Sequence, residues 1–195
     1  MIFSAIDCRI ASAAGRGLAA TLKLGLLAGA SAFTIASLAL ANPQGGEVVS
    51  GQATISAPSA TQTTITQSSD KAIIDWKSFN IGANESTTFV QPNANSVALN
   101  RIFDNDPSII AGLLSANGKL ILINRNGLLF DSGAVINAAG LVATTSDIGN
   151  DDFMAGRMNF SMPGAANAQI TNKGMITADE GGMIAFVAPS VRNSG

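Results

Sequence analysis

Hydrophobic residues after residue 41 come in short runs that alternate with polar residues, and Gly and Asn interrupt the runs every few positions. Alternation with a period of two is typical of strands that bury one face. It occurs at Ile74-x-Trp76, Phe79-x-Ile81, Val97-x-Leu99, Leu120-x-Leu122 and Leu128-x-Phe130. No stretch sustains the 3.6-residue period of an amphipathic helix. The pattern therefore predicts an all-β fold for residues 42–195.

The segment 120–143, LILINRNGLLFDSGAVINAAGLVA, is compatible with two chain directions. Asn126-Gly127 between two apolar runs is the strongest short hairpin signal, because both residues tolerate the positive φ of a tight turn. Two further apolar runs follow at once, each set off by Gly, and this suits a chain that winds continuously in one direction.

A repeat favours the winding arrangement. Ile170-Thr-Asn172-Lys-Gly174 recurs 21 positions later as Val191-Arg-Asn193-Ser-Gly195, and residues 135–140 are a looser copy about 35 positions earlier. A period near 20 with Asn and Gly at the corners predicts a parallel β-solenoid, in which equivalent strands stack about 4.8 Å apart. Asn126-Gly127 then forms a corner within a coil, and the corner asparagines are expected to hydrogen-bond from coil to coil.

Residues 42–195 correspond to roughly seven coils of this length, a rod of about 35 Å. The last residues stop inside a repeat unit, where a solenoid without a polar cap exposes an unpaired strand edge. We therefore expect the chain to be the beginning of a longer β-helical protein or a truncated copy of one.

The first 41 residues differ in kind from the rest. Arg9, Arg16 and Lys23 precede the uncharged stretch 24–41, which ends in the small-x-small pattern Ala39-Leu40-Ala41. We interpret residues 1–41 as an extended signal peptide that is cleaved after Ala41. A membrane anchor is the alternative, since about 18 uncharged residues approach the length of a span.

Composition excludes several function classes. The chain has no His and no Tyr, which rules out a histidine base, imidazole metal ligands and a Ser-His-Asp triad. Without residues 1–41, eight basic and twelve acidic residues remain, a net charge of −4, which is unfavourable for nucleic acid or anionic lipid. The single cysteine, Cys8, lies in the signal segment. We expect no enzyme activity, no cofactor and no metal, and we hypothesise that an uncrosslinked chain stays unfolded through a further transport step.

Several segments resemble a known family. They are Asn42-Pro-Gln-Gly-Gly, TQSSDKAIIDWKSFNIG (66–82), FVQPNANSVALNRI (89–102), ANGKLILINRNGLLF (116–130) and GLVATT (140–145). In this order they closely resemble the N-terminal secretion domain of filamentous haemagglutinin-like exoproteins. This domain is the two-partner secretion (TPS) domain, of the haemagglutination activity type. The resemblance covers nearly all of residues 42–195.

The resemblance implies a fold, a role and a partner. The fold is a single-stranded, right-handed parallel β-helix with coils of about 20 residues, in agreement with the usual hand of parallel crossovers. In the periplasm of a Gram-negative cell, such a domain is recognised by the periplasmic domains of an outer-membrane β-barrel transporter. It directs a downstream adhesin, haemolysin or contact-dependent toxin, often a virulence factor, to the cell surface or medium, and nucleates β-helix folding there. Contact with the membrane is then limited to transit.

Two family signatures can be placed on this chain. The Asn-Pro-Asn-Gly motif falls on Asn124, Arg125, Asn126 and Gly127, with arginine at the usual proline. The Asn-Pro-Asn-Leu motif falls on Gln91, Pro92, Asn93 and Ala94, altered at both ends. Proline would fix φ near −65°, which arginine permits without enforcing. We expect both segments to serve folding and partner recognition, with a purely structural corner as the alternative.

A third candidate for partner contact is the segment 73–81, with Trp76 and Phe79. In an unfolded or partly folded chain, its alternating apolar residues could add as a strand to a sheet edge of the partner. The alternative is that this tryptophan packs inside the β-helix or caps it.

Two rival functions remain open at this point. A polysaccharide-degrading β-helix would need converging carboxylates, and the acidic groupings look like solvated turns; they are Asp104 and Asp106, Asp147, Asp151 and Asp152, and Asp179-Glu180. A self-sufficient adhesin that binds glycan or heparin would need a basic face, and the basic residues are scattered, among them Lys71, Lys77, Arg101, Lys119, Arg125, Lys173 and Arg192.

Overall fold

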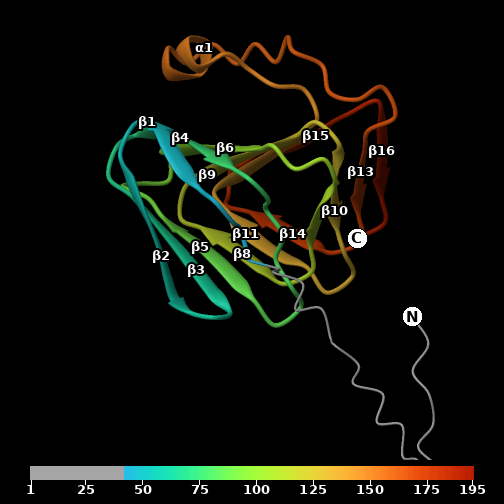
Figure 1. Ribbon diagram of the computed structural model, residues 1–195, viewed down its shortest axis with the longest axis horizontal. Coiled ribbons are helices and arrows are strands. Elements are labelled where there is room, and N and C mark those ends of the chain that lie inside the picture. The colour runs from blue at the N-terminus through green and yellow to red at the C-terminus, as the bar shows by residue number, and fades with distance from the viewer. Residues whose placement is uncertain (1–41) are drawn as a thin grey trace, which may run out of the picture. The chain divides into compact units, whose positions relative to one another are not determined.

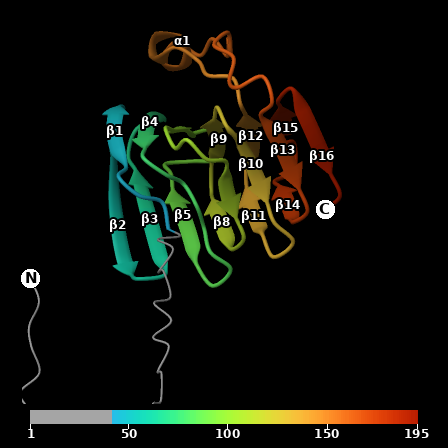
Figure 2. The same cartoon turned by 45° about the vertical axis from the view of Figure 1, so that its right-hand side comes forward.

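The computed structural model describes residues 42–195, which contain sixteen β-strands and one short α-helix. The strands form three sheets around a common interior (Figure 1). From β6 onward, the chain visits the three sheets in rotation, so that each circuit adds one strand to each sheet. In Figure 2 the strands of one of these sheets, which includes β5, β8 and β11, lie side by side in the order of successive circuits.

The three sheets are named here by number, with their strands in spatial order. Sheet 1 contains β1 (Glu47–Ser50), β4 (Lys71–Trp76), β6 (Val97–Ile102), β9 (Lys119–Asn124), β12 (Gly140–Thr144) and β15 (Ile184–Val187). Sheet 2 contains β7 (Ser108–Ile110), β10 (Gly127–Phe130), β13 (Gln169–Asn172) and β16 (Ser190–Asn193). Sheet 3 contains β2 (Ala53–Ser59), β3 (Gln62–Gln67), β5 (Ser86–Val90), β8 (Leu113–Ala116), β11 (Val135–Ala138) and β14 (Met175–Ala178).

Pairing between circuits is parallel from β3 and β4 onward, which confirms the predicted parallel β-helix. Leu120 of β9 pairs with Leu141 of β12, 21 positions later, as the repeat predicts. Ile170 pairs with Val191, and the Asn172 Nδ2 donates to Asn193 Oδ1 at 2.9 Å. The predicted coil-to-coil hydrogen bond between asparagines is therefore present at this corner.

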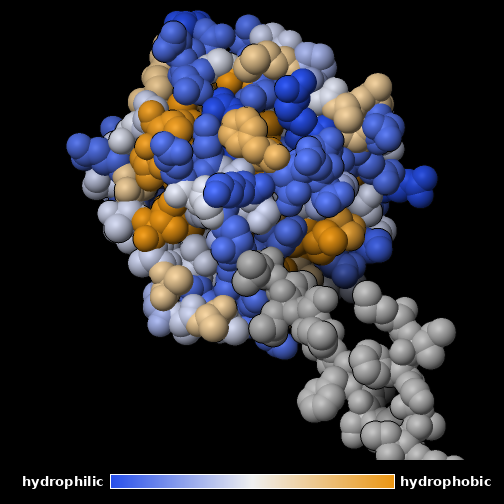
Figure 3. Space-filling model, in the orientation of Figure 1, coloured by the Kyte–Doolittle hydropathy of each residue, from blue (hydrophilic) through white to orange (hydrophobic). Residues whose placement is uncertain are grey.

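The interior is filled by one side of the strands from β1 to β15, whereas the residues of β16 are exposed. Each circuit points alternate residues inward, and these form one continuous hydrophobic cluster that includes Trp76, Phe79, Phe89 and Phe130. Burial of this kind is the main favourable term in folding. On the face drawn in Figure 3, the remaining hydrophobic residues form several separate patches among polar ones.

The N-terminal end of the stack departs from the parallel pattern. Strand β1 pairs antiparallel with β4, and β2 pairs antiparallel with β3 through a tight reversal near Ala60. Within residues 42–195 no earlier circuit covers the first one, and residues 42–46 cross its end, with Pro43 buried. A side chain at Gly46 would begin 2.5 Å from the Trp76 ring. Residues 42–46 therefore close the N-terminal end of the core.

A second departure is an excursion between β12 and β13. Residues 145–168, which we call the strap, leave the coil and carry helix α1 (Asn150–Met154), which lies outside sheet 1 in Figure 1. The helix ends at Met154, and Gly156 turns the chain two residues later: its φ of +81° suits glycine, and its N–H donates to Phe153 O. No helix was expected after residue 41, because one turn with a single buried residue, Phe153, has no detectable period.

Three sequence expectations need correction. The two larger sheets stack six strands each, so the described residues form about six turns rather than seven. Residues 135–140 are not a register copy of residues 170–174: Val135 lies in sheet 3, whereas Ile170 pairs with Leu128, 42 positions earlier, because the strap lengthens that circuit. Phe79 and Ile81 are buried but lie outside the strands, and Ile81 forms an isolated bridge with Ile110.

Candidate functional site

The Asn124–Gly127 corner connects β9 of sheet 1 to β10 of sheet 2, and the two strands pair only with parallel neighbours. The prediction of a corner within a coil is confirmed. Asn124 is fully buried; its Nδ2 donates to Asp106 O at 3.1 Å and to Ser108 Oγ at 3.0 Å, and its Oδ1 accepts from the Asn126 N–H at 2.9 Å. The side chain of Asn124 thus fixes both its own turn and the loop of the preceding circuit.

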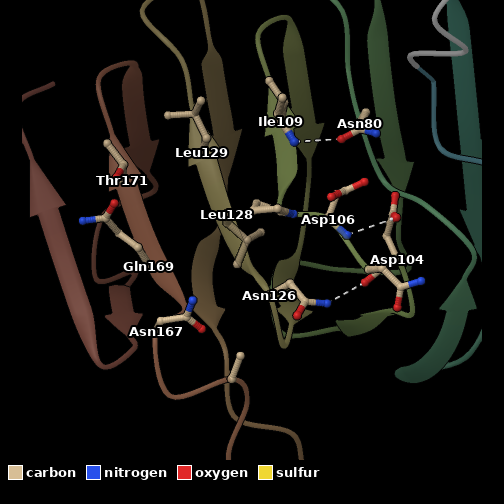
Figure 4. A pocket seen from close by; sticks show the side chains of 13 residues that line it. Asn80, Asp104, Asp106, Ile109, Asn126, Leu128, Leu129, Asn167, Gln169 and Thr171 are labelled. Atoms are coloured by element: carbon tan, nitrogen blue, oxygen red, sulfur yellow. Dashed lines mark hydrogen bonds between the residues drawn. The ribbon is translucent and has the colours of Figure 1, made fainter.

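Asn126 and Gly127 complete this corner. Asn126 Nδ2 donates to Asp104 O at 2.7 Å (Figure 4). Gly127 has a φ of +123°, and an added Cβ would lie 2.5 Å from Gln169 O of the next circuit. Only glycine fits this close approach of two backbones. The rigidity that a proline would give to the turn is supplied here by the side-chain amides.

Arg125 makes a different contact from its neighbours. Its guanidinium Nη2 donates to Pro163 O of the strap at 2.8 Å, and its carbonyl accepts from the Ala165 N–H at 2.8 Å. The side chain is otherwise exposed. The residue that replaces the family proline therefore ties the corner to the returning end of the strap.

The Gln91–Ala94 corner connects β5 of sheet 3 to β6 of sheet 1. Gln91 is buried, and its Nε2 donates to Gln67 Oε1 of the preceding circuit at 3.1 Å. Its backbone exchanges two hydrogen bonds with the side chain of Asn117 in the following circuit, at 2.6 and 2.8 Å. Pro92, Asn93 and Ala94 are exposed, and Asn93 Oδ1 accepts from the Asn95 N–H. Gln91 is a link between circuits, and the other three residues form an accessible tip.

The structure does not bring the two motifs together. Gln91–Ala94 precedes β6 and Asn124–Gly127 follows β9; β6 and β9 are parallel neighbours, so the motifs lie at opposite ends of sheet 1. Trp76 and Phe79 meet each other in the core, with ring centroids 5.3 Å apart, and each is at most 1% exposed. Trp76 Nε1 donates to the buried Asn100 Oδ1 at 3.0 Å. In the folded domain these two aromatic side chains are core residues, so a partner could reach them only before folding.

A groove of about 890 Å³ runs along the outer face of sheet 2 beside Asn126. Its walls carry amide, carboxylate and aliphatic side chains, which Figure 4 shows: Asn80, Asp104, Asp106, Ile109, Asn126, Leu128, Leu129, Asn167, Gln169 and Thr171. Asp104 Oδ1 accepts from the Asp106 N–H at 3.2 Å, and Asn80 Oδ1 accepts from the Ile109 N–H at 2.7 Å. The side chains of Asn80, Asp104 and Asn126 therefore hold the backbone around this loop. Among residues 42–195, no three His, Cys, Asp or Glu side chains are grouped as a metal would need.

A buried ion-pair network that the sequence did not reveal lies between sheet 1 and the strap. Arg101 is 8% exposed; it donates to Asp75 Oδ1 at 3.0 Å, to Asp147 Oδ1 at 2.8 Å and to Ile148 O at 2.8 Å. Burial raises the pKa of Asp75 above 3.8, an effect that Arg101 opposes. The expectation that Asp147 belongs to a solvated turn was wrong for its side chain, which is 13% exposed. These partners are 26 to 47 positions from Arg101, beyond the reach of a local motif.

The close approach at Gly127 leads to a testable prediction. Gly127→Ala should lower the free energy of unfolding by about 2 kcal/mol or more, because the new methyl meets Gln169 O and the positive φ is strained. Equilibrium unfolding in urea measures this loss. Gly149→Ala is the control: Gly149 has a φ of −65° and no atom within 4 Å of an added Cβ, so its change should stay below about 0.5 kcal/mol. Equal effects at both positions would contradict the account of this corner.

The predicted signal peptide and its cleavage after Ala41 lie outside the described residues. The residues that directly follow, 42–46, are those that close the N-terminal end of the core. Helix α1 has five residues, and residues 42–195 contain no apolar helix long enough to cross a membrane.

Comparison with known proteins agrees with this architecture. Residues 39–195 match the family model described as TPS secretion domain. The crystal structure of the HMW1 secretion domain from Haemophilus influenzae superposes with a TM-score of 0.72 and 38% sequence identity, over 79% of this chain and 41% of that one.

Two heme/hemopexin-binding proteins of Haemophilus influenzae are also similar. They are 50% and 49% identical to this chain over 106 residues, which is 54% of this chain. The chain covers 11% and 12% of the length of these curated relatives. A family model matched over residues 39–195, on a stacked parallel β-helix like that of HMW1, establishes that the chain belongs to the TPS secretion domain family.

Proposed function

We propose that residues 42–195 form the secretion-targeting domain of a larger exported protein. The periplasmic domains of an outer-membrane transporter recognise it, and the domain nucleates β-helix folding at the cell surface. The observation that carries the proposal is the family match over the whole described domain, supported by the likeness to the HMW1 secretion domain. The relatives' much greater length supports a passenger that follows in the same chain.

Recognition by strand addition agrees with the residues that are accessible before folding and those that are accessible after it. Before folding, the segment 73–81 offers alternating apolar residues to a sheet edge of the transporter. After folding, Trp76 and Phe79 are enclosed. The accessible parts of the motifs are then Pro92, Asn93, Ala94 and Arg125. We propose that the transporter binds the segment 73–81 in a partly folded chain, and that folding withdraws this segment and releases the domain.

The last circuit has the features that nucleation requires. Strands β14, β15 and β16 each pair with one neighbouring strand among the described residues. Large hydrophobic side chains on this circuit are exposed, among them Met175, Ile184 and Val191. A further circuit of the same chain would pair with these edges and cover these side chains, as each circuit does for the one before it.

Cell fractionation tests the proposed function. In cells that carry the partner transporter, the chain should reach the surface or medium; without the transporter it should accumulate in the periplasm. An unrelated exported protein, which does not use this transporter, serves as the control for envelope integrity. Export that is unchanged without the transporter would refute the proposal and favour a self-sufficient surface adhesin.

A further inference from the structure

The strap covers an apolar stripe on the outer face of sheet 1. Ile73, Leu99, Ile121 and Ile123 point away from the interior, yet each is at most 4% exposed. They pack with Ile148 and Phe153 of the strap, both fully buried, in a second hydrophobic cluster separate from the interior one. Three of the covered residues lie in one row across three circuits, since Ile73 pairs with Leu99 and Leu99 pairs with Ile121.

Three basic residues from three successive circuits bind backbone carbonyl groups of the strap. Lys71 of β4 donates to Phe153 O at 3.3 Å and Met154 O at 2.9 Å, at the C-terminal end of α1, where a cation is favourable. Arg101 of β6 donates to Ile148 O at 2.8 Å. Arg125, after β9, donates to Pro163 O at 2.8 Å. Three of the basic residues that are scattered in the sequence thus converge on one segment.

The strap also closes on itself at its base. Asp147 and Met162 form an antiparallel bridge, with hydrogen bonds of 2.7 and 3.2 Å between their backbones. Gly164 lies against Thr145 O and Arg125 O, where any side chain would clash. The strap is therefore a closed loop with one face on the sheet.

We propose that the strap is a clamp that holds together the three circuits containing β4, β6 and β9. The clamp follows the residues it binds by 38 to 83 positions in the chain. If the chain becomes available for folding from its N-terminal end, these three circuits stack first. Their outer stripe is then uncovered, and Arg101 lacks its partners in the strap. Docking of the strap then completes the domain. If the proposed function holds, this step follows export and makes the exported domain resistant to unfolding.

Native-state amide hydrogen exchange on the whole chain tests the clamp. Phe153→Ala removes its apolar anchor, and Lys71→Met removes the two bonds to the end of α1 while it keeps a long apolar side chain. In Phe153→Ala, exchange in β4, β6 and β9 should accelerate at least about tenfold more than in β13 and β16. Lys71→Met should produce the same pattern with a smaller amplitude. Met154→Ala, on the exposed side of α1, is the matched control and should leave the pattern unchanged.

Two outcomes would overturn the clamp. One is acceleration confined to residues 145–168; the other is an equal acceleration in all strands, which would make the strap an ordinary part of one cooperative unit. A secretion arm separates this inference from the proposed function. Phe153→Ala should be exported through the transporter like the parent chain, but a protease added to the medium should cleave it faster within residues 71–124. Export that does not depend on the transporter would refute the proposed function and leave the exchange result standing.

Discussion

Arg101→Met should lower the free energy of unfolding of the domain by about 3–5 kcal/mol, which is the usual cost of breaking a buried ion pair from one side. The guanidinium is almost enclosed, and its loss leaves Asp75, Asp147 and the carbonyl of Ile148 without their donor. Equilibrium urea unfolding, followed by Trp76 fluorescence, measures the change.

Two matched variants show whether this loss comes from the buried network. Arg157→Met removes an ion pair with Asp152 in the same strap, but the Arg157 side chain is 62% exposed, so the effect should stay within about 0.5 kcal/mol. Asp75→Asn should cost about 1 kcal/mol, because burial already raises the pKa of Asp75 and the amide oxygen still accepts from Arg101. A loss below about 1 kcal/mol for Arg101→Met would contradict the assignment.

Trp76→Ala should be equally damaging, with a loss of about 3–5 kcal/mol in the free energy of unfolding. The indole ring lies at the N-terminal end of the core, between Phe79 and the backbone of Gly46. Its removal opens a cavity under the crossing segment 42–46. It also leaves the buried Asn100 Oδ1 without the indole N–H. Since this variant has no tryptophan, far-ultraviolet circular dichroism during urea unfolding provides the measurement.

Trp76→Phe separates the cavity from the hydrogen bond. Phenylalanine keeps much of the ring contact and loses only the donor, so we expect about 1–2 kcal/mol. If Trp76→Ala and Trp76→Phe had the same small effect, the ring would not be part of the core. That result would reopen the hypothesis that Trp76 is accessible to a partner in the folded domain.

Much of the coil architecture is predictable from the sequence because it is repetitive and local. The alternation at Leu120-x-Leu122 identifies a strand with one buried face, and the 21-residue displacement between Ile170 and Val191 gives the register directly. A turn at Gly127 follows from glycine's tolerance of positive φ, and the repeat makes this turn a corner rather than a hairpin. Each signal lies within a few residues of the feature or one circuit away, where the repeat shows it again.

The departures from the repeat are not predictable in this way. The antiparallel pairing of β1 and β2 falls at the N-terminal end of the described stack, and the strand pattern of residues 47–59 does not give the direction of pairing. The strap is not detectable in the sequence, because its five-residue helix buries only Phe153 and so has no hydrophobic period. Arg101 and Asp147 are 46 positions apart, and their pairing depends on where the strap docks. Contacts of this kind follow from the assembled tertiary structure.

The candidate site was predictable in part. The motif segments were identified, and the structure gives each residue a physical role: Asn124 and Asn126 hold the preceding loop, and Gln91 links two circuits. The contact of Arg125 with the strap was missed, since proline at this position in the family gives no reason to expect a hydrogen-bond donor. The role of the two motif segments in partner recognition stays a prediction.

The most direct test of the central claim is binding between the purified chain and the purified periplasmic domains of its transporter. The measurement is made by titration with the native chain, and again with the chain diluted from urea at the moment of mixing. We predict saturable binding that is stronger for the chain caught before folding, because the segment 73–81 is then accessible. The circular dichroism of the native preparation should show β-structure. Absence of binding in both states would then contradict the claim that the transporter recognises this domain for secretion.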